Sequence, residues 1–264
     1  MAKRADLAVE KLKAELVPPP PFTLPGPAST PLFAPLISLE AEVANGALKT
    51  IWRQRGALGN ACARAMAETV SAEVSDECTQ LLQAPILLGR AGPLALDGLA
   101  PKARKELERE AAMLKERREA RLELWRVVAT FAVASEAGQD ALAALLRTDA
   151  SLIDHLFEPL TRCGPRVTPG VEAMFLSWLA GTHVSHAAWW AARLAPERAF
   201  ELLSPLCSAD QEARTTVVLA PMNGLQLWDR ADLRWLPLLE PLSSLFGFRS
   251  LTAVAVATLR ARAG

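Results

Sequence analysis

Two histidines three positions apart, His183 and His186, are the residues best suited to chemistry in this chain. At that spacing two side chains share one face of a helix, and imidazole serves both as a metal ligand and as a general base. A metal site needs further ligands, however, and no acidic or thiol side chain can be assigned to this pair from the sequence. We therefore expect hydrogen-bonded histidines and no cofactor, with a metal or ligand pocket near His183 and His186 as the alternative.

The third histidine gives no stronger signal. His155 follows Asp154 directly, and neighbouring residues on a helix do not face each other. No Ser-His-Asp arrangement can be assembled from that pair, so we assign no catalytic residue.

The four cysteines point to structure and not to catalysis. Cys62, Cys78, Cys163 and Cys207 are scattered, without a CxxC pair. The first sixteen residues lack the apolar core of a signal peptide. Scattered cysteines without an export signal are typical of reduced, buried thiols, so we expect a cytoplasmic protein.

The overall composition excludes two classes of protein. The chain has 29 basic and 29 acidic residues, whereas nucleic-acid binders usually carry a basic excess. We therefore expect no nucleic-acid partner. Hydrophobic residues make up 51% of the chain, which is too apolar for a disordered protein.

The same composition predicts an all-α fold. Ala, Leu, Arg and Glu dominate, and these residues lose little rotamer freedom in a helix. There is no Tyr, and period-2 alternation is hard to find.

The longest uncharged run covers 20 residues, from Ala173 to Ala192. A run of that length can span a bilayer. It contains both histidines, however, and Gly181-Thr182 near its middle is a typical boundary between two helices. We expect two buried helices and no membrane span.

A long charged helix is predicted from about 101 to 135. Pro101 suits a first helical turn, and apolar residues recur at steps of three and four from Leu107 to Ala132. The first half is predicted to be solvated on most sides and the second half to be buried. The Arg117, Arg118 and Arg121 cluster on this helix is balanced by nearby Glu residues and is predicted to be a solvated face.

Residues 1–37 are predicted to form an N-terminal amphipathic segment and a proline-rich arm. Tetraproline from Pro18 to Pro21 favours polyproline II. Interspersed apolar side chains such as Phe22 and Phe33 favour packing of the arm, either on its own fold or on a partner.

Residues 38–264 are predicted to form a single α-helical domain. Its C-terminal part, 136–264, contains frequent stops, which predicts an irregular stack of helical hairpins. Three similar fragments begin at Phe157, Leu203 and Leu239. Their spacing lies in the range of helical-pair repeats, so a HEAT- or TPR-like repeat remains an alternative.

These features favour a non-enzymatic helical adaptor or scaffold subunit in a larger bacterial assembly. Its partner is expected to be another protein or a second copy of the chain. Aromatic residues are enriched at interface hot spots; the predicted partner-binding residues are Phe22, Phe33, Trp178, Trp189, Trp190 and Trp235. The alternative is a helical enzyme or ligand-binding protein with its pocket near His183 and His186.

Overall fold

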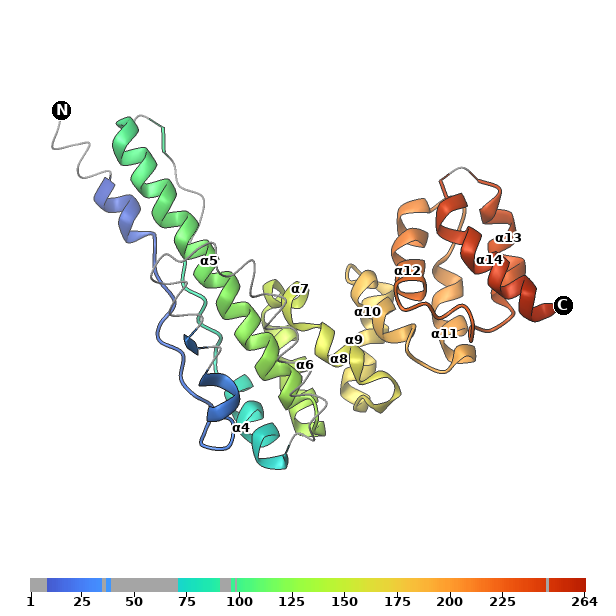
Figure 1. Cartoon of the computed structure of the whole chain (residues 1–264), viewed down its shortest axis with the longest axis horizontal. Helices are drawn as coiled ribbons and strands as arrows, with labels where there is room; N and C mark the ends of the chain where they lie inside the picture. The colour runs from blue at the N-terminus through green and yellow to red at the C-terminus, as the bar shows by residue number, and fades with distance from the viewer. Residues whose placement is uncertain (1–8, 35–36, 39–70, 91–95, 98, 246) are drawn as a thin grey trace. The chain divides into compact units, whose positions relative to one another are not determined.

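A computed structural model describes residues 9–34, 37–38, 71–90, 96–97, 99–245 and 247–264 (Figure 1). The described part is mostly helical and contains no strand beyond one isolated bridge between Val17 and Arg90. The all-α prediction is confirmed. The chain divides into two compact units, Met1–Asp149 and Ala150–Gly264. This boundary differs from the predicted division into 1–37 and 38–264, which stays a prediction.

In the part of the first unit that the structure describes, the main helices are α4 (Ala72–Leu82), α5 (Pro101–Ala132) and α6 (Glu136–Thr148). Helix α4 packs on both α5 and α6. Ser135 caps α6, because its Oγ accepts a hydrogen bond from the Gly138 N–H at 3.1 Å.

Helix α5 shows the predicted change from an exposed to a buried half. Of its first ten residues only Leu107 is buried, whereas Leu122, Trp125, Val128 and Phe131 in its last turns are all buried. One part of the prediction is wrong: Arg121 is only 4% exposed and does not belong to a solvated face.

Arg121 is buried because the described part of the N-terminal segment lies over it. The Arg121 Nη2 donates to the Pro20 carbonyl at 2.8 Å, and its guanidinium lies 5.3 Å from the Phe22 ring centre. Further along, the Glu77 carboxylate of α4 accepts hydrogen bonds from the Ser29 N–H at 2.9 Å and the Ser29 hydroxyl at 2.7 Å. Residues 20–33 therefore pack on the helices of their own unit.

The second unit is a series of short helices. They are α7 (Ile153–Leu156), α8 (Glu158–Arg162), α9 (Pro169–Ala180), α10 (Val184–Ala191), α11 (Pro196–Leu203), α12 (Glu212–Gly224), α13 (Trp235–Ser243) and α14 (Arg249–Ala263). Short 3₁₀ turns lie at Ala150–Leu152, Gly164–Arg166 and Ser204–Leu206.

Helix α10 is the centre of this unit. It contacts α8, α9, α11 and α12, and its Ala187, Ala188 and Ala191 are completely buried. Small alanine side chains let neighbouring helices approach closely, which explains how an eight-residue helix can carry so many contacts.

The uncharged run folds as two helices, as predicted. Helix α9 ends at Ala180, and α10 begins at Val184 after a cap at His183. In the part of the chain that the structure describes, no helix is both long and apolar enough to cross a membrane.

Candidate functional site

His186 on α10 is the centre of a short line of hydrogen bonds. Its Nε2 lies 2.8 Å from the Asp154 Oδ1 on α7, and its Nδ1 lies 3.3 Å from the Ser185 Oγ. An ionised carboxylate only accepts hydrogen bonds, so the imidazole Nε2 carries the proton toward Asp154. The neutral imidazole then offers its Nδ1 as an acceptor for the Ser185 hydroxyl.

Aromatic rings surround this imidazole. Phe157 meets the His186 ring edge-on with 4.4 Å between ring centres, and Trp178 on α9 lies 6.3 Å away. The centre of the His183 ring lies 5.7 Å from that of His186 and 5.4 Å from that of Trp178. The His186 side chain is 16% exposed, whereas the Asp154 side chain is 80% exposed. The site is therefore partly sheltered on the imidazole side and open to solvent on the carboxylate side.

This environment lowers the pKa of His186. Burial is the main cause, because it disfavours the charged imidazolium, and the hydrogen bond that His186 donates to Asp154 opposes the shift. The imidazole is consequently neutral at pH 7 and able to accept a proton.

The alternative prediction is a metal or ligand pocket near His183 and His186, and a metal site there needs further ligands. Among the residues that the structure describes, no group of three or more His, Cys, Asp or Glu side chains could hold a metal ion.

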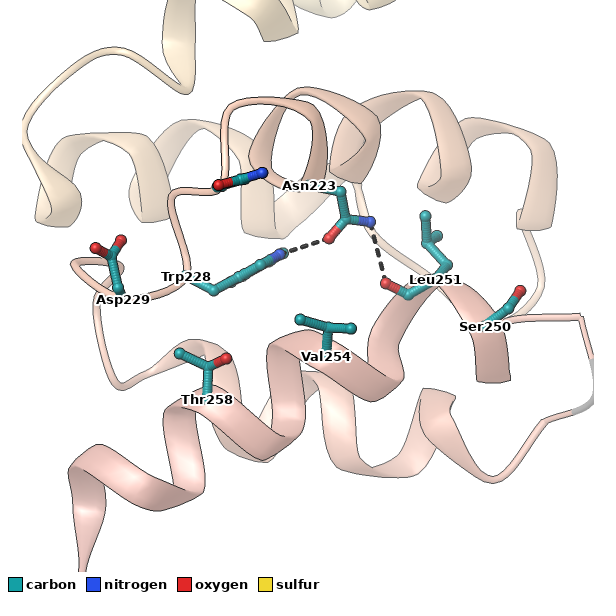
Figure 2. Close-up of a pocket in the computed structure, with 8 residues that line it drawn as sticks. Asn223, Trp228, Asp229, Ser250, Leu251, Val254 and Thr258 are labelled. Carbon is teal, nitrogen blue, oxygen red and sulfur yellow. Dashed lines mark hydrogen bonds between the residues drawn. The ribbon is translucent and has the colours of Figure 1, made fainter.

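A second feature is an open pocket of about 600 Å³ between the end of α12 and α14 (Figure 2). Asn223 holds its two sides together: its Oδ1 accepts from the Trp228 Nε1 at 2.5 Å, and its Nδ2 donates to the Leu251 carbonyl at 3.0 Å. Polar side chains of Gln226, Asp229, Ser250 and Thr258 line the rest, together with Val254, which is 67% exposed.

Gln226 at the rim of this pocket adopts φ +53°, a conformation that glycine usually supplies. It follows the C-cap of α12 in a Schellman arrangement, in which the Leu227 N–H bonds to the Met222 carbonyl and the Gln226 N–H bonds to the Asn223 carbonyl, both at 3.0 Å. The helix end explains the conformation, but it does not explain why glutamine occupies the position.

The predicted partner-binding residues divide into buried and half-buried ones. Phe33, Trp190 and Trp235 are at most 1% exposed within their own units, so their side chains offer no surface in this conformation. Phe22, Trp178 and Trp189 are half-buried. The Phe22 ring meets the Trp125 ring edge-on, with 5.6 Å between ring centres, and stacks with the Phe33 ring at 6.4 Å. The aromatic side chains of the described arm therefore pack within their own unit.

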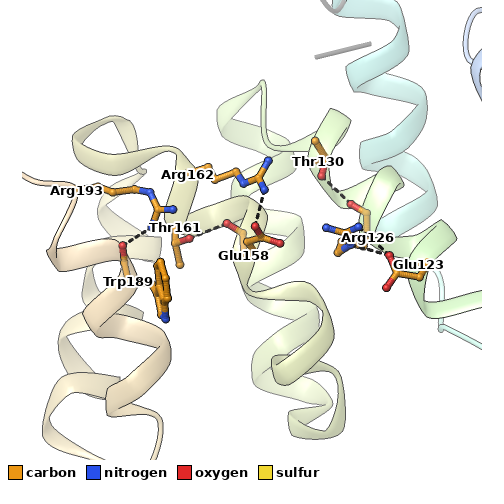
Figure 3. A network of polar contacts seen from close by, with 8 residues as sticks. All are labelled: Glu123, Arg126, Thr130, Glu158, Thr161, Arg162, Trp189 and Arg193. Carbon is orange, nitrogen blue, oxygen red and sulfur yellow. Dashed lines mark hydrogen bonds and ion pairs between the residues drawn. The ribbon is translucent and has the colours of Figure 1, made fainter. Parts of the chain in front are cut away.

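The adjacent indoles of Trp189 and Trp190 lie on different sides of the central helix α10. Trp190 stacks on Phe175 at 5.0 Å, and its Nε1 donates to the Gly164 carbonyl at 3.0 Å. Trp189 is shielded by Arg193, whose guanidinium lies 5.6 Å from the indole centre (Figure 3). Burial and the nearby Arg162 charge lower the pKa of Arg193. The indole edge of Trp189 also faces Gly224, where an added Cβ would lie 3.1 Å from the ring.

The structural interpretation of the described cysteines is supported by their burial. Among the described cysteines, Cys78 and Cys207 are buried and Cys163 is half-buried, and none of the three forms a disulfide. Burial raises the pKa of Cys78 and of Cys207 to about 12 in each case, so both thiols stay protonated and unreactive near neutral pH.

Sequence reasoning missed the connection between Asp154 and His186. The two residues are separated by 32 positions, and in the sequence Asp154 stands beside a different histidine, His155. No local periodicity predicts a contact between α7 and α10. The contact depends on how the intervening helices α8 and α9 pack.

Comparison with known proteins adds no family assignment, since no family model, curated protein or solved structure matches this chain.

Proposed function

We propose that this protein is a non-enzymatic helical adaptor that binds another protein, or a second copy of itself, through the exposed face of α9. The predicted bacterial assembly and a cytoplasmic location belong to the same proposal. The free, buried thiols of Cys78 and Cys207 support a reducing compartment.

The observation that carries this proposal is that none of the exposed residues of α9 is charged. The exposed residues of α9 are Pro169, Gly170, Ala173, Leu176, Ser177 and Ala180. Its single charged residue, Glu172, is half-buried, and Leu176 is 36% exposed. The centres of protein interfaces are depleted in charged residues, whereas exposed helix faces such as the first half of α5 are rich in them.

The half-buried Trp178 extends this surface at the C-terminal end of α9. It packs on Phe175 at 5.6 Å and stays partly accessible. Trp is a frequent interface hot spot. Of the six predicted partner-binding residues, Trp178 is therefore the one that we place in the proposed interface.

The proposal includes the predicted arrangement of the helices as a stack of helical hairpins. The consecutive helices α9 and α10 contact each other across a short loop, and so do α13 and α14. A stack of such pairs presents single helix faces to a partner, as α9 does.

Site-specific photo-crosslinking tests the proposed interface. A photoreactive phenylalanine analogue replaces Leu176 in one variant and Glu201, an exposed residue on the charged face of α11, in a matched control. We expect a discrete adduct from position 176 in the purified protein or in extract of the native host, and none from position 201. Mass spectrometry then identifies the crosslinked chain. Equal adducts from both positions, or none from position 176 in either setting, would contradict the proposal.

A further inference from the structure

The most specific arrangement outside the α9 face is the line of Ser185, His186 and Asp154. The Ser185 hydroxyl lies 3.3 Å from the His186 Nδ1, and the opposite imidazole nitrogen lies 2.8 Å from Asp154. A hydroxyl beside a base that is itself oriented by a carboxylate is the general pattern of an activated nucleophile.

The position of Ser185 on its helix adds a second element. Ser185 is the second residue of α10, where backbone N–H groups have no partner inside the helix. The first described backbone bonds of this turn are made by the N–H groups of His186 and Ala187, both to the His183 carbonyl, at 3.1 and 3.2 Å. The N-terminal turn of a helix favours negative charge, which suits an oxyanion that forms next to the hydroxyl.

We infer that Ser185 is a nucleophile, activated by His186 and Asp154, that takes an acyl group from small carboxylic esters. This activity goes beyond the proposed adaptor function and does not depend on it. In the first step the Ser185 Oγ bonds to the ester carbonyl carbon, and its proton passes to the His186 Nδ1. The carbon–alkoxy bond then breaks, and the leaving alcohol takes that proton.

The second step restores the serine. Water adds to the acyl carbon, and its proton passes to the His186 Nδ1. The bond from Oγ to the acyl carbon then breaks, Ser185 takes the proton back, and a carboxylic acid leaves. The Asp154 carboxylate holds the proton on Nε2 throughout, so it is a positioning residue. Trp178 and Phe157 provide apolar walls beside the imidazole, which suits a short apolar acyl group.

A fluorophosphonate probe tests this inference directly, because it modifies activated serines. Ser250 is a matched internal control: it is exposed and is also the second residue of a helix, α14, but it belongs to no such line of hydrogen bonds among the described residues. The whole chain is incubated with the probe, and the modified residues are mapped by mass spectrometry. Since a general base contributes about 10²–10⁴-fold, we expect Ser185 to react at least about tenfold faster than Ser250.

Variants separate an activated serine from an ordinary hydroxyl. Ser185→Ala should abolish the adduct, and His186→Gln should slow labelling of Ser185 to the rate of Ser250. Asp154→Asn should slow it partly, and because the Asp154 side chain is 80% exposed, this variant should fold normally. Equal labelling of Ser185 and Ser250, no labelling of Ser185, or unchanged labelling in folded Asp154→Asn and His186→Gln variants would overturn the inference.

Hydrolysis of p-nitrophenyl acetate supplies a second readout, because imidazole alone also cleaves this ester. If Ser185 is the nucleophile, an acetylated protein accumulates and the Ser185→Ala variant loses the activity. If Ser185→Ala keeps the wild-type rate, the histidine acts alone and the inference is wrong. The photo-crosslinking result at Leu176 is independent of both readouts, so failure of one proposal leaves the other standing.

Discussion

Arg121 on α5 donates a hydrogen bond of 2.8 Å to the backbone carbonyl of Pro20, 101 residues earlier in the chain. This contact joins the proline-rich segment to α5 within the first unit. It buries a guanidinium predicted from the sequence to lie on a solvated face. The same side chain lies over the Phe22 ring, so one residue carries both a polar and an aromatic contact with the segment.

Replacement of Arg121 by Ala should weaken the docking of this segment. Hydrogen bonds to charged groups contribute about 1.5–3 kcal/mol, so we expect the free energy of unfolding of the first unit to fall by about 2 kcal/mol. Urea denaturation measures this change. Arg118→Ala, on the half-buried part of the same helix, is the matched control and should change stability by less than about 0.5 kcal/mol. Equal effects of the two variants would contradict the assignment.

Gly138 should not tolerate a side chain. An added Cβ would lie 1.9 Å from the Ala132 carbonyl oxygen, which belongs to the backbone and cannot move aside without shifting α5. We expect Gly138→Ala to destabilise the first unit by about 3 kcal/mol. Gly181→Ala, where the nearest atom is 3.3 Å away, should cost much less in its unit. Thermal unfolding followed by circular dichroism compares them, and a stable Gly138→Ala variant would refute this close approach of α5 and α6.

Gln226→Gly should stabilise the second unit. A non-glycine residue in the left-handed region costs about 1–2 kcal/mol, part of which is offset by the greater freedom of glycine in the unfolded chain. We therefore expect a net gain of about 0.5–1 kcal/mol in chemical denaturation. Gln226→Ala, which keeps a Cβ, should show no such gain. A loss of stability in Gln226→Gly would mean that the glutamine side chain makes a contribution that outweighs the backbone strain.

The pKa of His186 should lie below the ordinary histidine value of 6.5. The folded state then binds the proton less readily than the unfolded state does. This histidine's contribution to stability is therefore complete above about pH 6.5 and is lost as the pH falls from there toward the folded pKa. NMR titration of the imidazole signals measures this pKa, with His186→Gln to assign the resonance.

Asp154→Asn provides the control for that titration. The Asp154 hydrogen bond and charge raise the His186 pKa against the effect of burial, so their removal should lower it further. An unchanged or higher pKa in Asp154→Asn would show that the 2.8 Å contact does not persist in solution.

Several elements follow from local sequence alone because their causes are local. The break at Gly181, the cap at Ser135 and the exposed first half of α5 each depend on residues within a few positions. Helix propensity, capping and periodicity act over one or two turns. The predicted proline-rich arm and the predicted repeat depend on longer-range packing, and they stay predictions.

The sequence by itself determined that this protein is helical, where α5 and the pair α9 and α10 lie, and that Trp178 and His186 share one uncharged region. Only the tertiary structure decided that Arg121 is buried under Pro20, that Trp190 and Trp235 are enclosed, and that Asp154 reaches His186. The reason is physical: helix formation is governed by near neighbours, whereas burial and hydrogen bonding between distant residues depend on which helix faces the whole chain brings together.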